Sequence, residues 1–142
     1  MDRAALDFAI ESGIEHGGWC PLGRIAEDGL IPERYHLHET PTSDYADRTE
    51  RNVLDSDATL IIGRDSELAG GTLFTAQMAQ KHRKPCLVVR EADGVENAAA
   101  SIQGFVDQNA ISSLNVAGPR NSESPGIVSF VRAVLAAATL TK

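Results

Sequence analysis

Residues 58–72 read ATLIIGRDSELAGGT, and this stretch decides the fold. Its first five residues, 58–62, are apolar and largely β-branched, which is typical of a buried parallel strand. A polar loop leads to Gly70, Gly71 and Thr72, and the apolar spacing over 73–79 predicts a helix that packs through Leu73, Phe74, Ala76 and Met78.

The double glycine at this strand-to-helix junction has two interpretations. Glycine lets the backbone approach a ligand closely, and the free N–H groups and the dipole of a helical first turn favour an anion such as phosphate. The hydroxyls of Thr72 and Thr75 belong to the same turn. The alternative is a plain connection whose glycines only relieve crowding, since Gly-Gly-Thr is much shorter than a full P-loop pattern.

Strands and helices alternate along the rest of the chain. We expect helices over 2–12, from Ser43 or Asp44 to Leu54, over 95–108 and over 126–140, and strands over 35–39, 85–89 and 113–117. The segment between Trp19 and Tyr35 contains two prolines and two glycines and predicts an irregular loop. This alternation predicts one α/β domain over residues 1–142, with a parallel sheet covered by helices on both faces.

Composition excludes several classes of protein. The chain has 142 residues, 42% of them hydrophobic and 23% charged, which suits one globular domain. A net charge of −7 argues against a nucleic-acid-binding surface. No apolar run is long enough to span a bilayer, and no signal peptide is recognisable. Cys20 and Cys86 form neither a disulfide framework nor a metal-ligand spacing, so we expect a cytoplasmic protein with no metal site.

The beginning of the chain departs from the usual order of a doubly wound fold. The first expected helix starts at residue 2, without the strand and ligand-binding loop that normally precede it. We therefore expect that an upstream strand and a glycine-rich loop are missing. An open strand edge would favour association, so we expect a homo-oligomer, with Leu6, Ile10, Leu60 and Ile62 becoming exposed.

Several short motifs, in one order over nearly the whole chain, resemble the putative molybdenum carrier family. They are HGGWCP at 16–21, GR at 23–24, AEDG at 26–29, IPERY at 31–35, RTERNV at 48–53, SDATLI at 56–61, GGT at 70–72, KPCL at 84–87 and NVAGPR at 115–120. The family resembles a circularly permuted branch of the Rossmann-like group that includes the lysine decarboxylase-like nucleotide hydrolases. The resemblance implies a Rossmann-like domain that binds the molybdenum cofactor or a nucleotide. Family members typically begin with a Gly-Gly-x-Thr-Gly-x-Asp loop, which is absent before Asp2.

Two further groups of residues are candidates for the ligand site. Arg48, Thr49 and Asn52 share one face of an expected helix, and Arg48 suits bidentate contact with an anion. Their alternative role is a solvated helix face. Asn115, Gly118 and Arg120 lie at or just past the carboxyl end of a predicted strand, where open α/β sheets bind ligands. The alternative there is a simple turn set by the proline between them.

Other chemistry-bearing residues receive no site assignment. Glu27 and Asp28 in the long loop could act as acid and base, but adjacent acidic residues are usually solvated surface. Cys20 could be a soft metal ligand, although a packed thiol is the commoner role. The four histidines at 16, 36, 38 and 82 show no ligand spacing.

The sequence therefore leaves three functions open. The first is a carrier that binds a small phosphate-bearing molecule, a pterin or a nucleotide, without chemistry of its own. The second is a nucleotide N-glycosidic hydrolase. The related hydrolases carry Pro-Gly-Gly-x-Gly-Thr-x-x-Glu, whereas this chain has Thr75 or Gln77 where the catalytic glutamate would be wanted, which favours the carrier. The third is a nucleotide-sensing protein.

Overall fold

A computed structural model describes residues 7–11, 17–20, 24–26, 29–30, 37–41, 45–63, 70–118 and 126–138. Within these residues the centre of the molecule is a parallel sheet with the strand order β6-β5-β7. The strands are β5 (Ala58–Gly63), β6 (Cys86–Arg90) and β7 (Leu114–Ala117). All six residues of β5 are buried, as the apolar stretch at 58–62 predicts. The parallel α/β fold is confirmed.

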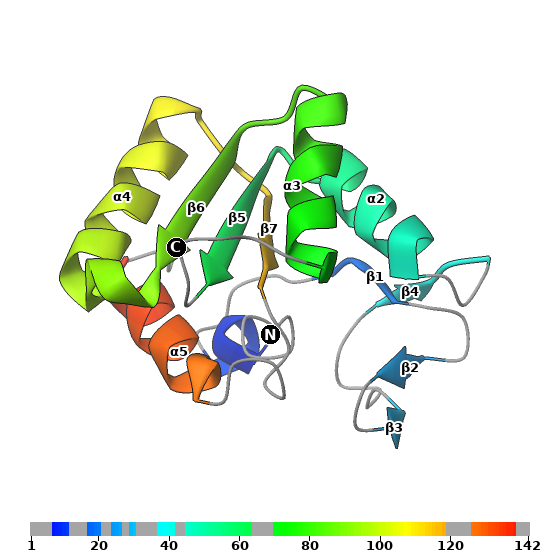
Figure 1. Cartoon of the computed structure of the whole chain (residues 1–142), viewed down its shortest axis with the longest axis horizontal. Helices are drawn as coiled ribbons and strands as arrows, with labels where there is room; N and C mark the ends of the chain where they lie inside the picture. Colours follow the sequence, from blue (N-terminus) through cyan, green and yellow to red (C-terminus); the bar gives the residue numbers. More distant parts are fainter. Residues whose placement is uncertain are drawn as a thin grey trace.

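Helices cover the two faces of this sheet. They are α2 (Tyr45–Asp55), α3 (Gly70–Lys81), α4 (Val95–Gln108) and α5 (Ile127–Ala137). In Figure 1, α4 and α5 lie on the left of the sheet, and α3 lies on the right with α2 beyond it. Leu60, Ile62 and Val89 pack with α4 and α5 in one apolar core. Since side chains alternate along a strand, Thr59 and Ile61 face the α3 side.

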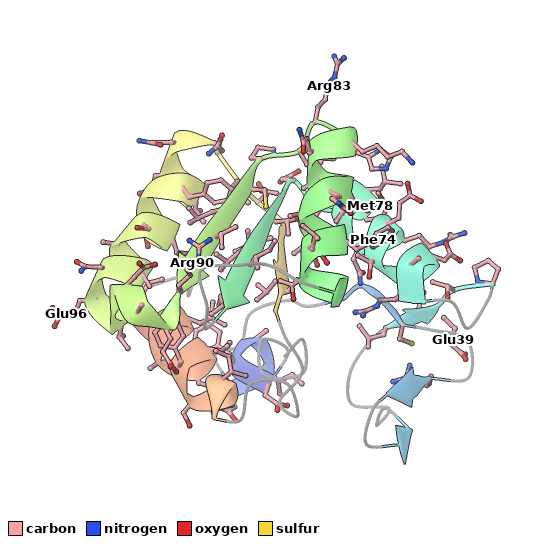
Figure 2. The ribbon with its side chains drawn as sticks, viewed as in Figure 1. Glu39, Phe74, Met78, Arg83, Arg90 and Glu96 are labelled. Carbon is pink, nitrogen blue, oxygen red and sulfur yellow. The ribbon has the colours of Figure 1, made fainter. Side chains whose placement is uncertain are left out.

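Helix α3 begins earlier than the sequence predicts. Gly70 and Gly71 belong to its first turn instead of a preceding loop. Its buried residues are Thr75 and Ala79, while Phe74 and Met78 are partly buried on the side toward α2 in Figure 2. The prediction that Leu73 packs is wrong, because its side chain is 41% exposed. The helix packs against the sheet through Thr75 and Ala79, and in this orientation Leu73 points towards solvent.

One polar cluster joins the end of α3 to α2. The Nε2 atom of His82 lies 2.8 Å from Oε2 of Glu50, and Nζ of Lys81 donates to the same oxygen at 3.3 Å. The hydrogen bonds from His82 and Lys81 lower the pKa of the Glu50 carboxyl. These contacts orient α2 along α3.

The segment between the first helix and α2 is more ordered than predicted. β1 (Trp19–Cys20) pairs in parallel with β4 (His38–Glu39), and β2 (Ile25–Ala26) pairs antiparallel with β3 (Gly29–Leu30). The prediction of an irregular loop was therefore wrong at Cys20, 25–26 and 29–30, whereas the strand predicted over 35–39 is present at 38–39. β2 and β3 have two residues each, which is too short to show an apolar period in the sequence.

The first helix is described at residues 7–11, where Phe8 packs against the α4–α5 core and Ala9 is buried. Glu11 forms an ion pair with Arg132 of α5. The side chain of Ile10 is 41% exposed, in agreement with the expectation that it lies at the surface. The expectation that Leu60 and Ile62 become exposed was wrong, because both are 0% exposed beneath α4 and α5. Leu6 lies outside the described residues.

Asp57 ties together the amino ends of β5 and β7. Its carboxylate accepts hydrogen bonds from the backbone N–H groups of Ser112 at 2.9 Å and Ser113 at 3.1 Å. These two bonds lower the pKa of the Asp57 carboxyl. A residue just outside the sheet thus sets the register of an edge strand.

The first prediction concerns the core. Ile102 of α4 is 0% exposed, so we expect Ile102→Ala to lower the free energy of unfolding by about 2–5 kcal/mol. The control is Leu73→Ala, which should change it by less than about 0.5 kcal/mol because Leu73 faces solvent. Urea denaturation measures both. A larger loss for Leu73→Ala than for Ile102→Ala would contradict this packing.

The second prediction concerns acid stability. A carboxyl whose pKa is lower when folded stabilises the protein above its unfolded pKa, and the benefit disappears as the pH falls through the folded pKa. Asp57→Asn keeps one acceptor oxygen but no charge. We expect the wild type to be more stable than this variant at pH 7 and to lose that advantage below about pH 4. Denaturation curves from pH 7 to pH 3 test this, and a pH-independent difference would contradict it.

Candidate functional site

The carboxyl ends of the parallel strands mark one edge of the sheet. In Figure 1 the arrowheads of β5, β6 and β7 point to this edge, and α3 and α4 begin there. The free N–H groups and positive dipole ends of these helices therefore gather at the edge where open α/β sheets bind ligands. This edge of the sheet is the candidate site.

The first turn of α3 offers open backbone at this edge. Gly71 is exposed, and a Cβ placed on it would meet no atom within 4 Å. The glycine is therefore not required by crowding within the described residues. Gly71 therefore does not serve to relieve crowding, which was the alternative explanation for the double glycine. The space beside it is available to a ligand.

Thr72 and Thr75 of the same helix differ in what they can offer. Thr72 is half-buried, whereas Thr75 is 5% exposed and its Oγ1 donates to the carbonyl oxygen of Gly71 at 2.8 Å. The hydroxyl proton of Thr75 is thus used within the helix. Towards a ligand, the Thr75 hydroxyl oxygen could therefore only accept a hydrogen bond.

Arg48, Thr49 and Asn52 lie on α2, as predicted, and α2 contacts β1. The carboxamide of Asn52 lies against Gly18, where a Cβ would come within 3.0 Å of Oδ1. Gly18 has a φ of +131°, which side chains rarely adopt. Close approach and backbone conformation together explain the glycine at this position.

Cys20 of β1 lies in a charged neighbourhood but is itself buried, with 1% of its surface exposed. Burial raises the pKa of its thiol; Arg24 opposes this rise, Glu39 adds to it, and Arg48 opposes it. Arg24 also donates from Nη1 to the carbonyl oxygen of Leu37 at 3.4 Å. The packed-thiol interpretation of Cys20 is confirmed.

Of the third predicted group, the structure describes Asn115 and Gly118, which lie apart along β7. Asn115 pairs with Thr59 near the amino end of β5, and its Nδ2 donates to Oγ1 of that threonine at 3.3 Å. Gly118 directly follows β7 at the carboxyl edge. Arg120 lies outside the described residues, as do Glu27 and Asp28. Asn115 thus stands apart from Gly118 along the strand.

Sequence reasoning missed Arg90, the last residue of β6. It is half-buried at the carboxyl end of the strand and pairs with Gly63, the last residue of β5. Its position directly after the apolar run 85–89 was the available signal, since charged residues at strand ends face the ligand edge of such folds.

Among the described residues, no group of three His, Cys, Asp or Glu side chains is arranged to hold a metal ion. His38 is exposed on β4, and His82 contacts Glu50. Within the same residues, no helix is long and apolar enough to cross a membrane.

Residues 1–139 match the model of the circularly permutated YpsA SLOG family. The chain belongs to this family. The permuted, Rossmann-like assignment made from its motifs is therefore confirmed. No curated protein matches the chain.

A solved structure agrees with this assignment. The chain is similar to the crystal structure of a putative molybdenum carrier protein from Syntrophus aciditrophicus. The two are 47% identical, and the match covers 97% of this chain and 87% of the other with a TM-score of 0.95. At this similarity the permuted YpsA fold is shared throughout the matched part.

The third prediction tests the contact between β1 and α2. We expect Gly18→Ala to destabilise the protein by about 1–3 kcal/mol, because it adds backbone strain and crowds Asn52. In an Asn52→Ala background the same change should cost less, since only the strain remains. A double-mutant cycle by chemical denaturation measures the difference, and equal costs in both backgrounds would contradict the contact.

Proposed function

We propose that the chain is a carrier for a small phosphate-bearing molecule, either the molybdenum cofactor or a nucleotide, bound at the carboxyl edge of the sheet. The observation that carries the proposal is Gly71, an exposed glycine with open space in the first turn of a helix at that edge. The name of the 47% identical neighbour, a putative molybdenum carrier, supports the ligand class.

The residues at the edge suit the phosphate part of such a ligand. The first turn of α3, from Gly70 to Thr72, supplies backbone N–H donors, and Gly118 lies at the end of β7. Arg48 and Asn52 lie on α2, which also contacts α3. The described residues contain no ready metal cluster, so in this proposal molybdenum enters as part of the ligand.

The same helix favours binding without chemistry. In the hydrolase pattern a glutamate follows the glycines on the helix, whereas here Thr75 is bonded within the helix and Gln77 is exposed and uncharged. Neither side chain is an acid or a base at neutral pH. This supports the carrier over the hydrolase.

The fourth prediction tests the first turn of α3. We expect Gly71→Val to weaken binding of a nucleoside monophosphate at least tenfold, because the side chain would occupy the space next to the N–H groups. Gly104→Val is the matched control: Gly104 is also a helical glycine with no atom within 4 Å of a Cβ, and it lies within α4. Valine has a higher helix propensity than glycine, so neither change should destabilise the fold. Titration calorimetry measures affinity, and thermal melting checks the fold.

Two results would contradict the proposal. Equal affinity of Gly71→Val and Gly104→Val would remove the α3 turn from the site. Release of free base from nucleoside monophosphates by the wild type would show an activity that the carrier lacks, and would support the hydrolase instead.

A further inference from the structure

Arg90 and Gly63 form the last paired position of two neighbouring strands. They are partners in the parallel register of β5 and β6, directly after the pair of Ile62 and Val89. Ile62 and Val89 face the α4–α5 core, so Gly63 and Arg90 face the opposite side of the sheet. Helix α3, which contacts both strands, covers that side.

Gly63 of β5 leaves a space next to its partner Arg90 on β6. It is buried, yet a Cβ on it would meet no atom within 4 Å. Every other residue of β5 fills its position with a buried side chain. Among the described residues, no atom therefore occupies the side-chain position of Gly63 at the carboxyl end of the central strand, and Arg90 lies on the adjacent strand.

The backbone of Arg90 is held in place. Its N–H donates to Oδ2 of Asp93 at 2.9 Å, across the short helix η1 (Glu91–Asp93). The side chain of Arg90 is half-buried at this strand end. Figure 2 shows Arg90 at this end of β6 and Arg83 extending from the opposite end of the molecule.

We propose that Arg90 determines ligand specificity by holding the phosphate group in the space beside Gly63. An arginine fork meets two phosphate oxygens at once, which a neutral ligand cannot exploit. The ligand class is therefore a phosphate monoester, selected over the corresponding uncharged nucleoside or pterin. The proposal rests on the proposed carrier function and adds the group that discriminates between these ligands.

The test compares charged and uncharged probes. The affinities for AMP and adenosine, and for GMP and guanosine, are measured by titration calorimetry on the full chain. We expect Arg90→Gln to weaken binding of the monophosphate about 10- to 100-fold, the loss of a charge-assisted pair, and to leave nucleoside binding unchanged. Arg90→Lys should restore part of the loss, because it keeps the charge but not the fork.

Two further variants separate this role from general effects. Arg83→Gln removes the same charge from an exposed residue at the other end of the molecule and should leave all affinities unchanged. Gly63→Val fills the space without altering charge and should weaken monophosphate binding as Arg90→Gln does. Thermal melting of each variant confirms that it is folded.

Three other results would contradict the role of Arg90 or the proposed function. Equal losses for monophosphate and nucleoside in Arg90→Gln would show that Arg90 only supports the structure. Unchanged monophosphate affinity would remove Arg90 from the site while leaving the carrier function intact. A wild type that binds no phosphate-bearing probe would overturn the proposed function and the role of Arg90 with it.

Discussion

The complete burial of β5 is the constraint on which the other elements depend. A strand whose six residues are all buried must be covered on both faces and paired on both edges. Its neighbours β6 and β7 satisfy the backbone hydrogen bonds, while α4 and α5 cover Leu60 and Ile62. Helix α3 covers the other face, where Ile61 is 0% exposed. A polar substitution in this strand would therefore affect every layer of the domain.

Parallel pairing then concentrates polar backbone at one edge. Because all three strands run the same way, their carboxyl ends and the amino ends of α3 and α4 meet there. Glycines at two of these places, Gly63 and Gly71, leave space that side chains would fill, and Arg90 supplies positive charge beside one of them. The net charge of the chain is −7, so such a local group of donors matters for an anionic ligand.

A second polar region lies around β1 and α2. Asn52 packs on Gly18, and Cys20 is buried within reach of the charges of Arg24 and Arg48. In this region the positive φ of Gly18 and its close contact with Asn52 require a glycine, whereas no atom of the described residues crowds Gly71 at the edge. The two kinds of glycine show that the HGGWCP and GGT motifs lie in different settings, one in close packing and one at the open carboxyl edge of the sheet.

The sequence by itself determined the strand at 58–62, the helix at 95–108 and the alternation that implies a parallel sheet. A continuous apolar run and a helical spacing of apolar residues both indicate directly which side chains are buried. Its motifs also identified the family. It did not reveal the strands at 25–26 and 29–30, the outward orientation of Leu73 or the use of the Thr75 hydroxyl within α3. It placed Asn115 at the ligand edge, although that residue bonds to Thr59 near the other end of β5. Only the tertiary structure decided these points and brought Arg90 beside Gly63, because strand register and helix rotation depend on contacts between residues distant in the chain.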